Sequence, residues 1–211
     1  MRYGLGMLTP SEVEGILTGG RELRNFEVKG AGSRADSQLV VKVIRAGLSM
    51  GNLRDGGYVL IGLDDRRLEE MQPGLTEDQA ASWSFDDVAR KFSEYSDPPL
   101  VFDLSELALT TGACVVLMEV SEFIDVPHIC ARQYDGALRK GALYVRSRGA
   151  AETIEVRDPV EMREVIDLAA EKALRRFVET TTRAGLNLSA SSDSEDNAET
   201  AFDEQRREAF E

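Results

Sequence analysis

The chain has 211 residues, of which 42% are hydrophobic and 30% are charged, a composition that allows one domain with a core, or a domain and a tail. No apolar run is long enough to span a membrane, and the N-terminus lacks the apolar segment of a signal peptide. We therefore expect no membrane partner. Cys114 and Cys130 have no CxxC spacing, so we expect reduced thiols and a cytoplasmic protein. His128 is the only histidine, which argues against histidine-rich metal sites and Ser-His-Asp catalysis.

The formal net charge of −13 is unevenly distributed. Residues 189–211 hold eight acids and two bases, a net of −6, which leaves −7 for the remainder. A surface that binds phosphate must therefore be a local basic patch. We expect residues 186–211 to form an acidic, disordered tail, because the segment has too few apolar residues to offset its ordering entropy. It is either a solubilising extension or an acidic strip that competes with nucleic acid for the protein's own basic patch.

The first half of the chain predicts two helices and two strands. Ser11 has the position of a helix N-cap, and Gly19-Gly20 ends that short helix. RELRNFEVKG, residues 21–30, is strand-like, and residues 58–63 are apolar throughout, as in a central strand covered on both sides. Between them, residues 37–50 carry apolar side chains at helical spacing. The opposite face of this helix consists of Gln38, Lys42, Arg45 and Ser49.

The second half predicts a helix, several strands and a long last helix. Ser84 and Asp87 have capping-box spacing at the start of a helix that Pro98-Pro99 closes. Asp158 and Pro159 are a strong helix start, followed by an apolar stripe. The expected strands are residues 100–109, 113–123, 126–134 and 142–149. The stripe of the last helix consists of Met162, Val165, Ile166, Ala169, Ala173 and Phe177.

These elements predict an α/β fold of the mixed α+β class. We expect a single domain over residues 1–185, with a mixed central sheet flanked by helices and a long C-terminal helix. The acidic tail, residues 186–211, follows it.

Three blocks of polar and glycine residues stand in a fixed order between Glu22 and Thr153. They are Glu22, Glu27 and Lys29; then Asn52, Gly56, Gly57, Gly62 and Asp65; then Tyr144, Arg146 and Thr153. In this order and composition the chain resembles the Schlafen-type AlbA domain family. It departs from the family pattern at Leu23, at Val28, and at Leu53, where an added residue alters the turn.

The resemblance implies nucleic-acid binding. For the animal members it also implies a metal-dependent endoribonuclease acting on structured RNA. Carried over by position, the catalytic acids would be Glu22, Glu27 and Asp65. An ATP-binding label also attached to the family finds no support, because the chain has no GxxxxGK[ST] phosphate loop.

The chemistry of the same three acids also allows a site for a divalent metal ion. Mg²⁺ or Mn²⁺ prefers carboxylate oxygens, which Glu22, Glu27 and Asp65 supply from separate elements. Lys29 lies two residues beyond Glu27, so both project from one strand face, where the lysine could bind phosphate or stabilise a transition state. Glu22 converges with Glu27 only if the backbone turns near residues 23–25. The alternative is that Glu27 and Lys29 form an exposed ion pair and that Asp65 is only a turn residue at the exit of the strand. Asp64 is the rival of Asp65 for the place in the site, because neighbouring residues of a strand point to opposite faces and the sequence does not fix the register.

The candidates for phosphate contacts are basic residues from several elements: Lys42, Arg45, Arg54, Arg139, Lys140, Arg146 and Arg148. Two functions follow. The first is a divalent-metal-dependent endoribonuclease that uses Glu22, Glu27, Asp65 and Lys29, with Mg²⁺ or Mn²⁺ as the cofactor. The second is a non-catalytic nucleic-acid-binding or regulatory module in which the acids are structural. The expected partner is nucleic acid, RNA rather than DNA, and the last helix and exposed strands could serve a homodimer.

Overall fold

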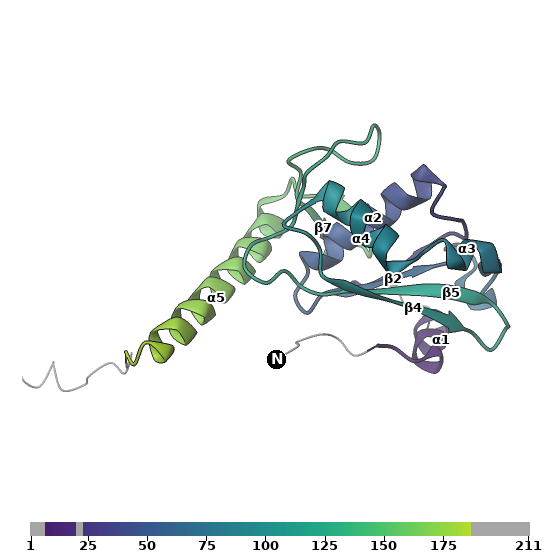
Figure 1. Ribbon diagram of the computed structural model, residues 1–211, viewed down its shortest axis with the longest axis horizontal. Coiled ribbons are helices and arrows are strands. Elements are labelled where there is room, and N and C mark those ends of the chain that lie inside the picture. Colours follow the sequence, from purple (N-terminus) through teal and green to yellow (C-terminus); the bar gives the residue numbers. More distant parts are fainter. Residues whose placement is uncertain (1–6, 20–22, 187–211) are drawn as a thin grey trace, which may run out of the picture. The chain divides into compact units, whose positions relative to one another are not determined.

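The computed structural model describes residues 7–19 and 23–186, and Figure 1 shows its ribbon. Internal contacts divide the chain into two compact units, Met1–Ala170 and Glu171–Glu211. The expected site residue Glu22, and residues 187–211 of the expected tail, lie outside the described residues. Within the described ranges, no helix has both the length and the apolarity needed to cross a bilayer.

The first unit is built on a mixed sheet of four strands, in the order β1-β2-β5-β4 among the described residues. β1 (Phe26–Lys29) and β2 (Gly57–Ile61) pair in parallel. β5 (Cys114–Val120) pairs antiparallel with both β2 and β4 (Phe102–Ala108). Every residue of β2 is buried, which confirms the predicted central strand. The sheet and its helices confirm the expected mixed fold class.

Helices cover both faces of this sheet (Figure 1). α2 (Ser37–Gly51) and α4 (Phe85–Tyr95) pack on one face, and α1 (Pro10–Thr18) packs on the other. Because side chains alternate along a strand, Val59 of β2 joins the core under α2 while Tyr58 joins the core over α1. α2 also connects the two parallel strands, so its position relative to their ends is fixed by the chain itself.

Shorter elements complete the described part of the chain. They are η1 (Leu68–Glu70), α3 (Glu77–Ala81), β3 (Ser96–Asp97), β6 (Ile129–Cys130), β7 (Tyr144–Arg146) and β8 (Thr153–Glu155). β3 pairs with β6, and β7 pairs antiparallel with β8. The β7–β8 hairpin packs against α2.

α5 (Pro159–Arg183) begins in the first unit and ends in the second. In the first unit it buries Val165 and Leu168 with Phe123. Ile166, which the sequence pattern placed on the same apolar stripe, is instead 55% exposed. In the second unit Phe177 is also 55% exposed.

Three local predictions are corrected by hydrogen bonds. The N-cap of α1 is Thr9 rather than Ser11, because the Thr9 hydroxyl accepts from the Glu12 backbone and the Glu12 carboxylate accepts from the Thr9 backbone. Ser84 precedes α4 as predicted, but its hydroxyl donates to the Asp87 carboxylate at 3.0 Å and caps no backbone group.

The third correction concerns the strand expected over residues 126–134, of which only β6 forms. The side chain of Asn52 accepts a hydrogen bond from the His128 backbone N–H and donates one to the His128 carbonyl, both at 2.8 Å. The backbone N–H and carbonyl of His128 therefore form hydrogen bonds with a side chain and not with a neighbouring strand. Asn52 also donates to the Tyr144 carbonyl at 3.0 Å, so this buried residue of the second motif block has a structural role.

Candidate functional site

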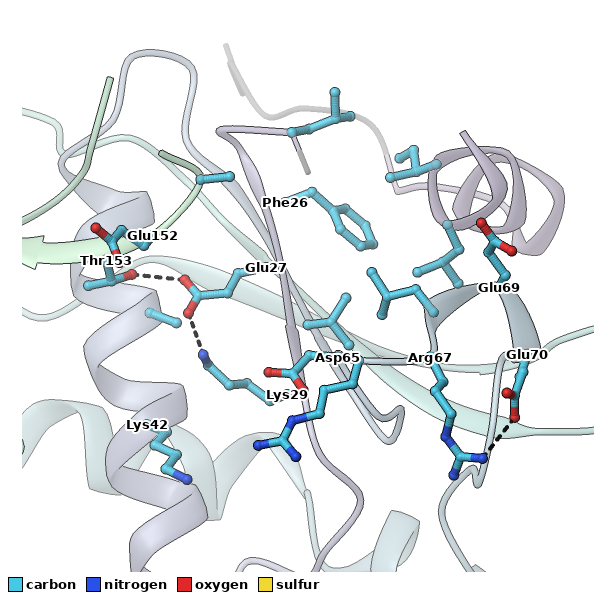
Figure 2. A pocket seen from close by; sticks show the side chains of 18 of the residues that line it. Phe26, Glu27, Lys29, Lys42, Asp65, Arg67, Glu69, Glu70, Glu152 and Thr153 are labelled. Carbon is cyan, nitrogen blue, oxygen red and sulfur yellow. Dashed lines mark hydrogen bonds and ion pairs between the residues drawn. The ribbon is translucent and has the colours of Figure 1, made fainter. Parts of the chain in front are cut away.

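The β1–α2–β2 unit brings three of the predicted site residues to one place. Lys29 at the end of β1 lies opposite Ile61 at the end of β2, and Asp65 follows within four residues of that end. The carboxyl ends of parallel strands meet at the same edge of a sheet, so Glu27, Lys29 and Asp65 line one cavity (Figure 2). The turn expected near residues 23–25 is present at Arg24–Asn25.

Glu27 is fully engaged by side chains around it. Its Oε1 accepts from the Lys29 ammonium, which confirms that the two residues share a strand face (Figure 2). Its Oε2 accepts from Arg146 Nη1 at 2.6 Å and from the Thr153 hydroxyl at 2.8 Å. The Glu27 side chain is only 13% exposed. Both carboxylate oxygens are thus bound to donors from β1, β7 and β8.

Arg146, one of the expected phosphate contacts, is buried. Its side chain is 1% exposed, and its guanidinium donates to the Glu27 carboxylate and to the backbone carbonyls of Arg24 at 2.8 Å and Ala151 at 2.7 Å. A buried arginine needs a counter-charge and filled hydrogen bonds, and Glu27 with these carbonyls supplies both. Arg148, another of the expected phosphate contacts, is exposed.

The β7–β8 hairpin covers the part of the polar face of α2 that carries Arg45 and Ser49. The Ser49 hydroxyl, fully buried, lies 2.8 Å from the Thr153 hydroxyl. Arg45 donates to the Thr153 carbonyl at 3.1 Å, and its guanidinium lies 5.3 Å from the centre of the Tyr144 ring. The hydroxyl of Thr153 therefore connects α2 to Glu27 of β1.

A second arginine–carboxylate pair was missed by the sequence analysis. Arg24 binds Glu164 of α5 through two nitrogens, at 2.7 and 2.8 Å, and also donates to the Arg146 carbonyl. This bonding to Arg24 lowers the pKa of the Glu164 carboxyl, and Arg148 at 3.0 Å adds to the effect. No local pattern could have signalled a pair whose members lie 140 positions apart.

The cavity has a volume of about 680 Å³ and two unlike walls. One wall is charged and includes Lys29, Lys42, Asp65 and Arg66, and Figure 2 shows Lys42 and Asp65 on the side where Lys29 reaches Glu27. Lys42, Asp65 and Arg66 are exposed. None of these side chains forms a hydrogen bond or a salt bridge with another described residue, and the charge of Arg66 contributes to the lowered pKa of the nearby Asp64. The apolar lining residues, called the apolar wall below, are Ile16, Leu17, Leu23, Phe26, Val28 and Leu68. Figure 2 shows Glu69, Glu70 and Arg67 of the same lining beyond Phe26, on the side away from Lys42.

Asp64, the rival of Asp65, has another role. Its carboxylate accepts from the Arg66 backbone N–H at 3.0 Å and lies 3.5 Å from the Arg67 guanidinium. The backbone hydrogen bond, above all, lowers the pKa of Asp64. Asp64 therefore holds the turn after β2, and Asp65 is the residue that lines the cavity.

The residues in the described ranges do not fit a divalent metal ion. No group of three or more His, Cys, Asp or Glu side chains among them could hold one. Glu27 has donors on both oxygens, so a metal ion would have to displace a lysine or an arginine. We therefore derive no metal-dependent step from these side chains.

The remaining predicted cations lie outside the lining of this cavity. Arg139 pairs with Glu155 and thereby lowers the pKa of that carboxyl, while Arg148 pairs with Glu164. Arg54 and Lys140 are exposed. Of the seven candidates, the cavity thus brings together only Lys42 and Arg45.

No model of a known protein family matches the chain, and no curated protein does. Among solved structures, the chain is similar to the crystal structure of the DIP2311 protein from Corynebacterium diphtheriae, with 14% sequence identity and a TM-score of 0.44. The similarity covers 69% of this chain and 29% of that one, so this chain spans less than a third of the length of the structure it matches.

Proposed function

We propose that the protein is a non-catalytic nucleic-acid-binding module that holds a phosphate group, preferentially of RNA, in the cavity beside β1 and β2. The observation that carries this proposal is the pair Lys42 and Arg66. Both are exposed cations of the cavity lining that form no ion pair with another described residue. Ammonium and guanidinium groups in such a position are the usual partners of phosphate oxygens.

The charge balance of the cavity supports this location. Five basic and five acidic side chains line it, whereas the whole chain carries a net charge of −13. Arg146 adds one further positive charge directly behind Glu27. The cavity is therefore a locally favourable place for an anion on an otherwise acidic protein.

The binding module is preferred to the endoribonuclease because Glu27 has a structural task. Its carboxylate compensates the buried charge of Arg146 and accepts from Thr153, so a metal ion would have to displace these donors. The resemblance to the Schlafen-type AlbA domains supports nucleic-acid binding in either case. A cytoplasmic location and a homodimer are further parts of this proposal, and the exposed Phe177 of α5 supports the latter.

A binding measurement with matched charge reversals tests the proposal. We expect Lys42→Glu to weaken binding of a fluorescent single-stranded oligoribonucleotide about tenfold at low salt, since one phosphate contact becomes a repulsion. Lys140→Glu makes the same charge change at an exposed residue outside the cavity and should leave the affinity within twofold. Fluorescence anisotropy at several salt concentrations gives both affinities and the salt slope.

Equal losses in both variants would indicate a diffuse basic surface in place of the cavity, and an affinity independent of salt would refute nucleic-acid binding at this site. The catalytic alternative is tested with Mn²⁺ and the same RNA. If the wild type cleaves the RNA and Asp65→Asn does not, the protein is a nuclease and the proposal of a binding module is wrong.

A further inference from the structure

The apolar wall of the cavity is not explained by phosphate binding. Ile16 and Leu17 come from α1, Leu23 from the segment before β1, and Leu68 from η1, so three separate elements contribute aliphatic side chains. Leu23 is 39% exposed, and Ile16 and Leu68 are half-buried. A phosphate group, which stays hydrated or bound to cations, gains nothing from such a surface.

The two walls face one space. In Figure 2 Phe26 lies on the side away from Lys42, and Asp65 and Lys29 lie between them. A volume of about 680 Å³ is within the range of pockets that enclose a small organic group. A ligand that uses the whole cavity therefore has an apolar, compact part next to an anionic part.

We propose that the cavity receives a single unpaired nucleotide of a nucleic-acid strand, with its base against the apolar wall and its phosphate on Lys42 and Arg66. This inference rests on the proposed function and adds the class of ligand to it. A base inside a duplex is stacked and paired, so it cannot enter a side pocket unless it leaves the helix. Single-stranded or looped segments are thus the preferred ligand, and a regular duplex is disfavoured.

The test compares three fluorescent oligoribonucleotides of one length: a base-bearing single strand, the same backbone without bases, and a duplex. We expect the wild type to bind the base-bearing strand at least about fivefold more tightly than either of the others, because apolar contact with one base is worth about 1 kcal/mol or more. An oligodeoxyribonucleotide of the same sequence separates a requirement for the base from one for the ribose.

Two variants in the apolar wall and one control outside it test whether this wall contacts the base. Leu23→Ser should weaken binding of the base-bearing strand about threefold or more and leave the base-free strand unchanged. Ile124→Ser, at a residue that is 71% exposed and outside the cavity lining, should change neither. Leu68→Ala is a second change in the wall, and far-UV circular dichroism verifies that each variant is folded.

Equal affinities for the base-bearing and base-free strands would overturn this inference and leave phosphate binding intact. The tightest binding by the duplex would overturn it as well. An absence of binding to all three ligands would instead remove the proposed function on which the inference rests.

Discussion

At the scale of single residues, two acids of the same cavity have opposite surroundings. Glu27 accepts hydrogen bonds from Lys29, Arg146 and Thr153, whereas Asp65 is exposed and has no side-chain partner among the residues described. A carboxylate that neutralises a buried arginine is needed for folding, because its loss leaves an uncompensated charge in the interior. An exposed carboxylate without partners contributes little to stability.

This contrast gives a stability prediction. Glu27→Gln should lower the free energy of unfolding by about 3 kcal/mol, since Arg146 loses its counter-charge. Asp65→Asn, the matched change in the same cavity, should alter it by less than about 0.5 kcal/mol. Urea denaturation followed by circular dichroism measures both values. Two similar values would contradict the structural role assigned to Glu27.

At the scale of elements, the site depends on how α2 and the β7–β8 hairpin meet. The sequence predicts β2 as a buried strand, the helix over residues 37–50 and the common face of Glu27 and Lys29, because each is a local pattern of period 2 or 3.6. It does not predict the burial of Arg146, whose partner Glu27 is 119 positions away. A charged residue in a sequence is usually on the surface, so its local pattern does not indicate burial. Only the tertiary contacts show that the charge is buried and compensated.

The same limit applies to the polar face of α2. Lys42 and Arg45 look alike in the sequence, yet Lys42 is exposed in the cavity while Arg45 packs on Tyr144 under the hairpin. The difference arises from the hairpin, which covers one part of the helix face and leaves the other open. Its position is set by hydrogen bonds such as Ser49 to Thr153, which join residues 104 positions apart.

The pair of Arg24 and Glu164 connects the segment before β1 to α5, and it predicts a pH dependence. Arg24 lowers the pKa of Glu164 in the folded chain, so the pair stabilises the fold above the ordinary glutamate pKa, and this contribution is lost as the pH falls through the lowered pKa. We expect Glu164→Gln to cost about 1 to 2 kcal/mol of unfolding free energy at pH 7.

The cost of Glu164→Gln should shrink as the pH falls below the ordinary glutamate range, where the unfolded wild type binds a proton that the variant cannot. Urea denaturation of both proteins between pH 7 and pH 3 measures the difference. A cost that stays constant over this interval would show that the carboxylate charge is not what stabilises the contact.

At the scale of the whole molecule, a local cationic site must act within an acidic chain. The net charge of −13 repels a polyanion at long range, while Lys42 and Arg66 attract a phosphate only over a short distance. Of this charge, −6 belongs to residues 187–211, which hold eight acids and two bases. Removing that segment would reduce the net charge of the remainder to −7.

A chain that ends at residue 186 should therefore repel a polyanion less than the full chain does. At low salt we expect it to bind a single-stranded oligoribonucleotide several-fold more tightly than the full chain, because the repulsion is reduced. The gain should fall toward zero near 0.5 M salt, where charges are screened within a few ångströms. A full-length variant with the eight acids changed to Asn or Gln separates charge from chain length, and it should match the shortened chain. If the neutral variant instead behaves like the wild type, the acids do not compete with RNA, and the segment is a solubilising extension only.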